Sequence, residues 1–333
     1  MNILFYCPFK FNLNSKNLSS LGGIESLNID LTKNLAKKNF KIFLATYCNK
    51  EIKKKNLINI PIKKIINNKS NLRFDIIISS NDPIIFDKFK YAKKILWMHN
   101  TLSIEKSFRK KKFLPIIRNK ISVVFVSKYL EKKTSKLFFF NKKQTINNFL
   151  SEKFIIQDLN YNRKKIIIWS VQRDKGLDKT IEMWIKKVYP FNPKLKFHIY
   201  GIDKKKYNDK KNYLNNYNIY FFGRVPKNQL KRIYSKSLAM ICLGYDETFC
   251  LNALEANACG LPLLTFGKTV LKYYAVNNFN SYLVNNYNEL SQKINLISKN
   301  KINKKIINNS YNRSKEYRIE KIVQSWIKLF KVL

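Results

Sequence analysis

Residues 239–266 read AMICLGYDETFCLNALEANACGLPLLTF, which is a short apolar run, a helical run and a second short apolar run. The runs Ala239–Leu243 and Pro262–Phe266 have the length and apolar character of buried strands. Between them, Cys250–Ala258 has the composition of a helix. A strand, a helix and a strand in succession are typical of parallel sheets. This stretch therefore predicts an α/β fold.

The same alternation extends toward both ends of the chain. In the second half it predicts strands at Ile166–Ser170, Lys196–Tyr200 and Ile219–Phe222, and helices at Leu177–Val188 and Lys227–Ser235. In the first half it predicts strands at Ile3–Cys7, Lys41–Thr46, Asp75–Ser79, Ile95–Met98 and Val123–Ser127. A helix with one buried stripe is expected from Ile24, Leu27, Leu31 and Leu35. The two series predict two Rossmann-like domains.

The segment from Asn147 to Lys165 is polar and Asn-rich, with no sustained period. It predicts a linker, a hinge for domain closure and a domain boundary near residue 155. We expect an N-terminal domain over 1–155 and a C-terminal domain over 156–312. Apolar residues recur on one face between Ile319 and Phe330, which predicts a docked C-terminal helix. We expect residues 313–333 to cross back to the first domain.

The charge is strongly one-sided, with 65 Lys+Arg against 21 Asp+Glu and a net charge of +44. Such a charge favours polyanions or an anionic membrane surface, but dispersed lysines usually form a solvated surface. No apolar run approaches the roughly 20 residues of a membrane span, and the first residues do not resemble a signal peptide. We therefore expect a cytoplasmic protein.

Metal and redox cofactors are not expected. Five cysteines form no CxxC pair, the two histidines stand apart, and no GxGxxG is present. The cysteines at 242, 250 and 259 are interpreted as small core residues. His198 lies inside a strand-like run and is interpreted as structural.

Two glutamates carry the strongest chemical signal. Glu247 follows a predicted strand, and Glu255 lies about two turns into the next helix. Free N–H groups around Thr248–Leu251 and the helix dipole suit a diphosphate, while both carboxylates can accept hydrogen bonds from hydroxyls. A sugar nucleotide offers both partners. The alternative is that Glu247 caps the helix and Glu255 is a solvated side chain.

This region resembles the retaining glycosyltransferases of the GT-B fold, in particular glycosyltransferase family 4, whose two-glutamate motif has seven intervening residues. Leu254-Glu255-Ala256 and Gly260-Leu261-Pro262 match the end of that motif. The resemblance implies two Rossmann-like domains that face each other across a cleft. It also implies that Glu247 contacts the donor sugar and Glu255 the ribose. The donor-binding loop would include Thr248, Phe249, Cys250 and Leu251.

Further matches lie upstream. The run SVQRDKGLD at 170–178 resembles the family's phosphate-binding segment, which assigns Arg173 and Lys175 to the diphosphate as catalytic groups. Two positions depart from the family: Ser170 stands where an arginine is usual, and Cys250 stands where glycine is usual. The match FFGRVP at 221–226 places Val225 beside the nucleobase.

The first half carries two further resemblances. Gly22 and Gly23 resemble the glycine-rich loop near the donor phosphate and the acceptor. His99, after a predicted strand, resembles the histidine that faces the donor sugar, so it is expected to be catalytic. Its alternative is a buried structural histidine.

The resemblance implies a metal-independent retaining transferase, with a nucleotide sugar as substrate and no cofactor. A glycan or lipid-linked acceptor would place it in cell-surface glycan, lipopolysaccharide or glycolipid synthesis. The alternatives are an inverting transferase with His99 as base, a sugar-nucleotide epimerase, or a basic nucleic-acid-binding protein. Nucleic acid is disfavoured as a partner, because no reading motif is present.

The segment from Phe108 to Lys120 mixes six basic residues with apolar ones and contains no acid. It predicts peripheral binding to an anionic membrane on its inner face. The alternative is an ordinary helix of the first domain, since Pro115 prevents a long amphipathic helix.

Overall fold

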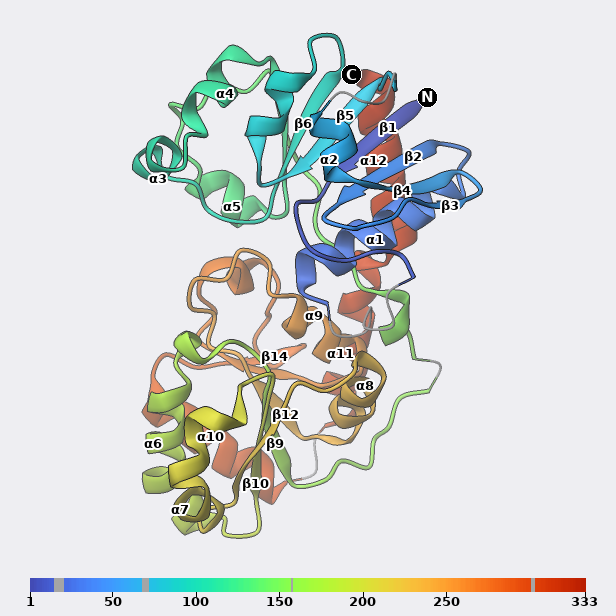
Figure 1. Ribbon diagram of the computed structural model, residues 1–333. Helices are drawn as coiled ribbons and strands as arrows, with labels where there is room; N and C mark the ends of the chain where they lie inside the picture. The colour runs from blue at the N-terminus through green and yellow to red at the C-terminus, as the bar shows by residue number, and fades with distance from the viewer. Residues whose placement is uncertain (15–20, 68–71, 157, 301–302) are drawn as a thin grey trace. The chain divides into compact units, whose positions relative to one another are not determined.

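The computed structural model describes residues 1–14, 21–67, 72–156, 158–300 and 303–333 (Figure 1). The chain forms two compact units. Unit 1 comprises Met1–Phe149 and Ile319–Leu333, and unit 2 comprises Leu150–Arg318. The expected α/β architecture is present in both.

Unit 1 is built on a sheet with the strand order β3-β4-β2-β1-β5-β6-β7-β8. Every described pair in it is parallel except β3 with β4. The strands are β1 (Asn2–Tyr6), β2 (Lys41–Thr46), β3 (Ile52–Lys54), β4 (Leu57–Pro61), β5 (Ile76–Ser80), β6 (Lys93–Met98), β7 (Ile121–Phe125) and β8 (Lys142–Thr145). Its central strands are apolar on both faces, as a covered parallel sheet requires.

Helices cover this sheet. They are α1 (Gly23–Ala36), α2 (Ile62–Ile66), α3 (Ile104–Arg109), α4 (Phe113–Arg118), α5 (Lys128–Lys133) and α12 (Ile319–Val332), with a 3-10 helix η2 (Pro83–Lys88). The predicted stripe of α1 is confirmed, because Leu27, Leu31 and Leu35 are buried. In α12, the fully buried Trp326 packs edge-on against Trp97 of β6, with ring centroids 5.2 Å apart. The last helix is therefore part of the core of unit 1.

Unit 2 contains a parallel sheet with the order β11-β10-β9-β12-β13-β14. Its strands are β9 (Ile166–Trp169), β10 (Lys196–Tyr200), β11 (Ile219–Gly223), β12 (Ala239–Ile241), β13 (Leu263–Thr265) and β14 (Ser281–Leu283). Its helices are α6 (Leu177–Lys187), α7 (Lys211–Asn215), α8 (Lys227–Lys236), α9 (Leu251–Ala258), α10 (Tyr287–Lys299) and α11 (Lys304–Ser314). The 3-10 helices are η3 (Glu152–Phe154), η4 (Arg173–Lys175), η5 (Tyr189–Phe191), η6 (Lys204–Lys210), η7 (Thr269–Tyr273) and η8 (Lys315–Tyr317).

The chain passes between the units after Phe149 and after Arg318, whereas the sequence placed the boundaries at 155 and 312. Local hydrogen bonding explains the difference. The Leu150 amide donates to the carbonyl of Tyr317 over 2.7 Å, and Leu150 bridges Arg318. The polar segment expected to be a linker therefore packs within unit 2 from residue 150, although residue 157 lies outside the described residues.

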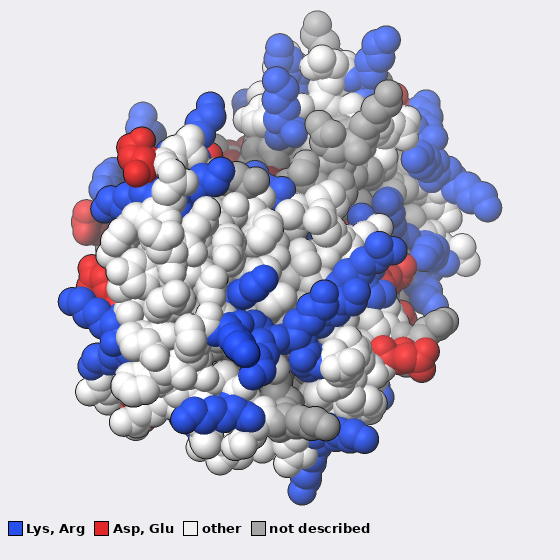
Figure 2. Space-filling view, turned by 90° about the horizontal axis from the view of Figure 1, so that it is seen from below, with Lys and Arg blue, Asp and Glu red and all other residues white. Residues whose placement is uncertain are grey.

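Positive charge is spread over the surface. Figure 2 shows Lys and Arg side chains scattered across one face, with few Asp or Glu side chains between them. This distribution fits the interpretation of the +44 charge as mostly a solvated lysine surface.

Candidate functional site

The candidate site lies in unit 2, at the carboxyl edge of its sheet. Strand β9 has β10 on one side and β12 on the other, so the strand order reverses between β9 and β12. Open α/β sheets bind ligands at such a reversal, in the crevice beyond the strand ends. Lys175 lies in the loop after β9, and Glu247 lies in the loop after β12.

Lys175 joins these two loops. Its side chain is buried, and Nζ donates to the carbonyl of Asp246 over 3.1 Å. Gly176 follows with φ +103°, a conformation that favours glycine. A Cβ there would lie 2.9 Å from Cδ1 of Leu243, so the close packing also requires glycine.

Arg173 comes from the same turn but contacts different groups. Its Nη2 lies 3.0 Å from Oδ2 of Asp178, and its guanidinium lies 5.3 Å from the ring centroid of Tyr207. The Tyr207 hydroxyl donates to Oδ1 of Asp178 over 2.8 Å. Arg173 is exposed and partly neutralised, which makes it a weaker candidate for the diphosphate than Lys175.

Ser170, which stands where the family usually has arginine, is turned into the fold. Its Oγ lies 2.6 Å from the hydroxyl of the buried Tyr234, and its carbonyl accepts a hydrogen bond from the Asn252 side chain. Ser170 therefore ties β9 to α8 and α9. The usual arginine has no direct replacement at this position.

Glu247 is half-buried at the mouth of the loop after β12. Burial raises the pKa of its carboxyl to about 7, while Lys175 works against the rise, and Asp174 and Asp246 add to it. Near neutral pH the group therefore populates both protonation states. It can accept a hydrogen bond from a hydroxyl or donate one to an oxygen.

Glu255 is buried in α9, with 5% of its surface exposed. The alternative of a solvated side chain is therefore wrong. Burial raises the pKa of its carboxyl, and the Lys227 ammonium, 3.4 Å away, opposes the rise. Lys227 was not anticipated, because a lysine at the start of α8 gives no sign in the sequence that it will meet α9.

The other residues of unit 2 that the sequence predicts to bind the donor lie at the same edge of the sheet. Gly223 ends β11 with φ +69°, and the half-buried Val225 lies between it and α8. Thr248 and Phe249 are half-buried in the loop before α9, and Leu251 is its first residue. The Lys227–Glu255 pair links the start of α8 to α9. The sequence-derived donor residues of unit 2 thus occupy loops and helix starts after β9, β11 and β12.

Cys250 explains why its position usually holds glycine. Its backbone has φ +61° and ψ 69°, and it caps α9. A residue other than glycine is strained in this left-handed region. The Cys250 Sγ lies 3.3 Å from Sγ of Cys242, so the side chain is held in the core of unit 2. The interpretation of Cys242, Cys250 and Cys259 as core residues is confirmed, because all three are buried.

Gly22, Gly23 and His99 belong to unit 1. Gly22 caps α1, and Gly23 is its first residue. A Cβ at Gly22 would lie 2.6 Å from Oε2 of Glu25, which favours glycine unless Glu25 moves. His99 directly follows β6, and its amide donates to Oδ1 of Asn81 over 2.7 Å.

The His99 imidazole is a neutral group. It is 4% exposed, and burial lowers its pKa to about 3. Its ring packs on Trp97, with centroids 4.5 Å apart. His198 is interpreted as structural, and in β10 its ring indeed packs against Tyr220 and Phe222.

The described residues contain no group of three or more His, Cys, Asp or Glu side chains that could hold a metal ion. None of the described helices is long and apolar enough to cross a membrane.

Comparison with known proteins finds a family match that covers most of unit 2. Residues 151–313 match the family described as Glycosyl transferases group 1. No curated protein sequence matches the chain.

Several solved structures share the whole fold. Sucrose-phosphate synthase from Thermosynechococcus elongatus is similar with a TM-score of 0.75 and 15% identity, over 99% of this chain and 98% of that one. Anabaena HepE in complex with UDP and glucose has a TM-score of 0.73 and 14% identity, over 100% of both chains. WaaG, a glycosyltransferase involved in lipopolysaccharide biosynthesis, has a TM-score of 0.71 and 13% identity, over 98% of this chain and 99% of that one. These likenesses identify the fold as GT-B.

The strain at Cys250 predicts a contrast between two substitutions. Cys250→Gly relieves the left-handed strain but loses the packing of Sγ, so we expect the unfolding free energy to change by no more than about 1 kcal/mol. Cys250→Val places a β-branched residue at a positive φ and should cost more than about 2 kcal/mol. Thermal unfolding of both variants measures the difference. A valine variant as stable as the glycine variant would contradict the described backbone.

The raised pKa of Glu247 predicts a pH-dependent stability. Because its folded pKa of about 7 lies above the ordinary 4.5, protonation stabilises the fold at low pH. The free energy of unfolding therefore falls as the pH rises from 4.5 to 7. It falls by about 1.4 kcal/mol for each pH unit between the unfolded and the folded pKa. Glu247→Gln cannot ionise, so the unfolding free energy of wild type should fall relative to it over this range. Stability curves of wild type and Glu247→Gln that run parallel over this range would contradict the prediction. Glu182→Gln, which removes an exposed carboxylate of α6, is the control variant.

Proposed function

We propose that this chain, a glycosyltransferase of the GT-B fold whose residues 151–313 belong to the group 1 glycosyl transferases, moves a sugar from a nucleoside-diphosphate sugar to an acceptor hydroxyl with retention of configuration. One observation carries the proposal. The buried ammonium of Lys175 and two carboxylates with raised pKa values, Glu247 and Glu255, lie in adjoining loops and a helix at the carboxyl edge of one sheet.

The proposed role of Lys175 follows from its charge and position, and the proposed contacts of Glu247, Glu255 and Val225 are taken from the resemblance to glycosyltransferase family 4. Lys175 and the free N–H groups at the start of α9 hold the diphosphate, because both supply positive charge in a sheltered place. Glu247 contacts the donor sugar hydroxyls, and Glu255 contacts the ribose. Val225 lies beside the base. Thr248, Phe249, Cys250 and Leu251 supply the wall and the N–H groups of the loop.

The proposed reaction proceeds on one face of the sugar. The bond between the anomeric carbon and the diphosphate oxygen breaks, and the acceptor oxygen bonds to that carbon from the same side. The proton of the acceptor hydroxyl passes to a phosphate oxygen of the leaving group. Lys175 and the α9 N–H groups stabilise the charge that develops on the diphosphate, so the step needs neither a metal ion nor an enzyme nucleophile.

The state of His99 favours retention over inversion. An inverting transferase needs a side-chain base to take the acceptor proton. The pKa of His99, lowered to about 3 by burial, makes its imidazole a weak base. The roles of His99 toward the donor sugar, and of Gly22 and Gly23 toward the donor phosphate and the acceptor, are carried over from the resemblance and stay predictions.

The neighbours suggest the substrate class. The HepE structure holds UDP and glucose, and WaaG is involved in lipopolysaccharide biosynthesis. By analogy we propose that this chain takes a nucleotide-sugar donor and a glycan or lipid-linked acceptor. It would then act in the synthesis of a cell-surface glycan, lipopolysaccharide or glycolipid.

The proposal extends to a place of action, peripheral on the cytoplasmic face of a membrane. In unit 1, α3, α4 and α5 lie together on the side of the sheet on which β6 lies (Figure 1). Phe108, Leu114 and Phe139 there are 57%, 66% and 75% exposed. Aromatic contacts join α3 to α4, because the rings of Phe108 and Phe113 are stacked. The ring centroid of Phe138, in the segment after α5, lies 6.2 Å from that of Phe113. An anionic bilayer suits these apolar residues, because basic residues close to them in the sequence are exposed, namely Arg109, Lys110, Lys111, Lys120 and Lys136.

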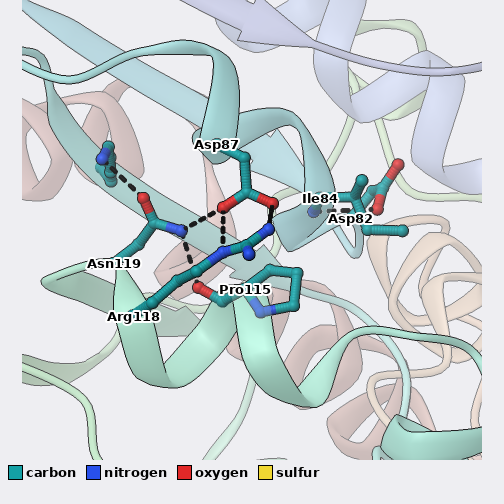
Figure 3. Close-up of polar contacts among 7 residues, drawn as sticks. Asp82, Ile84, Asp87, Pro115, Arg118 and Asn119 are labelled. Atoms are coloured by element: carbon teal, nitrogen blue, oxygen red, sulfur yellow. Dashed lines mark hydrogen bonds and ion pairs between the residues drawn. The ribbon is translucent and has the colours of Figure 1, made fainter.

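A polar network fixes the helix that carries this surface (Figure 3). Arg118 Nε and Asn119 Nδ2 each donate to Oδ1 of Asp87 over 2.7 Å. Asn119 also accepts from Lys94 Nζ of β6 over 2.6 Å and donates to the carbonyl of Pro115 over 2.9 Å. Because Pro115 and Ile116 face the core, Leu114 is left at the surface. Pro115 lies in the first turn of α4, where its missing N–H costs no helical hydrogen bond.

Lys112 differs from the exposed basic residues, because its side chain makes a hydrogen bond within unit 1. It is half-buried, and Nζ donates to the carbonyl of Asn81, the residue whose side chain also holds the amide of His99. Burial lowers the pKa of Lys112. A membrane test should therefore leave Lys112 in place.

Lys175→Ala is predicted to weaken binding of a nucleoside diphosphate far more than binding of the nucleoside. A lost hydrogen bond to a charged group costs about 1.5–3 kcal/mol, which is roughly 10- to 150-fold in affinity. Titration calorimetry with UDP and uridine, or their counterparts for another base, measures both. Lys186→Ala, an exposed lysine of α6, is the control and should change neither. Equal losses for both ligands would remove Lys175 from the phosphate site.

The membrane surface is tested by sedimentation with anionic vesicles. Wild type should bind in a salt-sensitive way, and the triple variant Arg109→Gln, Lys110→Gln, Lys111→Gln should lose most of that binding, at about 1 kcal/mol per residue. The control Lys321→Gln, Lys328→Gln, Lys331→Gln removes equal charge from exposed positions of α12. If both triple variants lose binding equally, the attraction belongs to the diffuse charge of the chain.

A further inference from the structure

Unit 2 contains a cavity apart from the loops after β9 and β12. It lies between α8 and the segment that precedes β9, and its volume is about 420 Å³. This size falls in the range of small-ligand sites, about 300–1,000 Å³. Its lining residues are Lys153, Asn160, Asn228, Lys231, Arg232, Ser235 and Lys236.

The chemistry of this lining is one-sided. Four of the side chains are cationic, the other three are an hydroxyl and two carboxamides, and none is a carboxylate. Asn228, Arg232 and Ser235 recur at spacings of four and three, so they share one face of α8. No ion pair within the described ranges involves any of the four cations. Like charges brought together in a concave site repel one another and attract an anion.

The cavity walls are held by hydrogen bonds of their own. Lys231 Nζ donates to the carbonyl of Ile155 over 2.6 Å, which fixes the preceding segment against α8. Asn160 Nδ2 donates to the carbonyl of Ser235 over 3.1 Å. The phenyl ring of Phe154 stacks on Tyr234, with centroids 6.2 Å apart. Because these contacts hold the cavity walls before a ligand binds, the loss of conformational entropy on binding is small.

The carboxyl end of α8 would normally repel an anion, because its last carbonyls are unpaired. Here each is taken by a donor. The carbonyl of Tyr234 accepts from Arg163 Nη1 over 2.8 Å, that of Ser235 from Asn160, and that of Lys236 from the Lys164 amide over 2.7 Å. The negative end of the helix is thereby screened, and the cations are left facing the cavity.

We propose that this cavity is an accessory site for a phosphate group. The planar guanidinium of Arg232 suits two phosphate oxygens, the lysines add point charges, and Asn228, Asn160 and Ser235 can donate to the remaining oxygens. Neither Lys175 nor Glu247 lines it, so it is separate from the donor site. The phosphate group is borne either by a soluble molecule or by a lipid headgroup.

Calorimetry of the full chain with inorganic pyrophosphate tests the site. Wild type should show two classes of site, and Arg232→Gln, Lys236→Gln should weaken one of them at least 10-fold. Both side chains are exposed, so their loss leaves the fold intact. The control Lys210→Gln, Lys211→Gln removes the same charge from exposed positions elsewhere in unit 2.

The outcomes separate this site from the donor site. Lys175→Ala should abolish pyrophosphate binding at the donor site and leave binding at the accessory site unchanged. If Lys175→Ala keeps both classes of site, that result contradicts the proposed donor site and not the accessory site. If the Arg232/Lys236 variant binds pyrophosphate as wild type does, or loses no more than the Lys210/Lys211 control, the accessory site is refuted.

Vesicles containing phosphatidic acid identify the source of the phosphate. A headgroup site predicts that the Arg232/Lys236 variant binds these vesicles less than the Lys210/Lys211 control does, and that pyrophosphate releases wild type from them. A site for a soluble phosphate predicts equal vesicle binding by the two variants, with pyrophosphate binding lost only in the first.

Discussion

The hydrogen bond from Lys175 to the carbonyl of Asp246 joins the two loops that flank the strand reversal of unit 2. It holds a buried ammonium where the loop after β12 approaches the start of α9. That ammonium opposes the rise in the pKa of Glu247, so the charge state of the carboxylate depends on it. The second cation of the site, Lys227, does the same for Glu255. The candidate site thus contains two carboxyl groups whose pKa values are raised by burial, and a lysine from a neighbouring loop or helix opposes each rise.

Much of the fold could be predicted from sequence, because central parallel strands are continuously apolar. The predicted ranges of β2 and β10 coincide with the structure, and the other predicted strands are displaced by at most two residues. Strand β8, KKQT, could not be found in this way, because it lies at the sheet edge with no apolar pattern. The short edge strands β3 and β14 carry equally little signal. The segment after residue 150 reads as a polar linker, but its few apolar residues, such as Phe154 and Ile156, are buried within unit 2.

The candidate site could be predicted where its residues lie close together in the sequence. The glutamate spacing and the turn around Gly176 lie within single runs of the sequence, and the structure places Lys175, Glu247 and Glu255 on one side of unit 2. Partners that meet only in the fold could not be predicted. Lys227 reaches Glu255 from 28 residues away, and Tyr207 reaches Asp178 from 29. Arg173 is paired with Asp178, whereas Lys175 donates to the carbonyl of Asp246.

The central claim is that the nucleotide-sugar donor is held at the strand reversal of unit 2. A thermal-shift panel of sugar nucleotides first identifies the donor, since a ligand at 100 times its dissociation constant adds about 2.7 kcal/mol of stability. Hydrogen–deuterium exchange of the full chain is then measured with and without that donor. The account predicts protection concentrated in residues 171–177 and 244–256. Protection that spares both segments, or a panel in which no sugar nucleotide stabilises the protein, would contradict it.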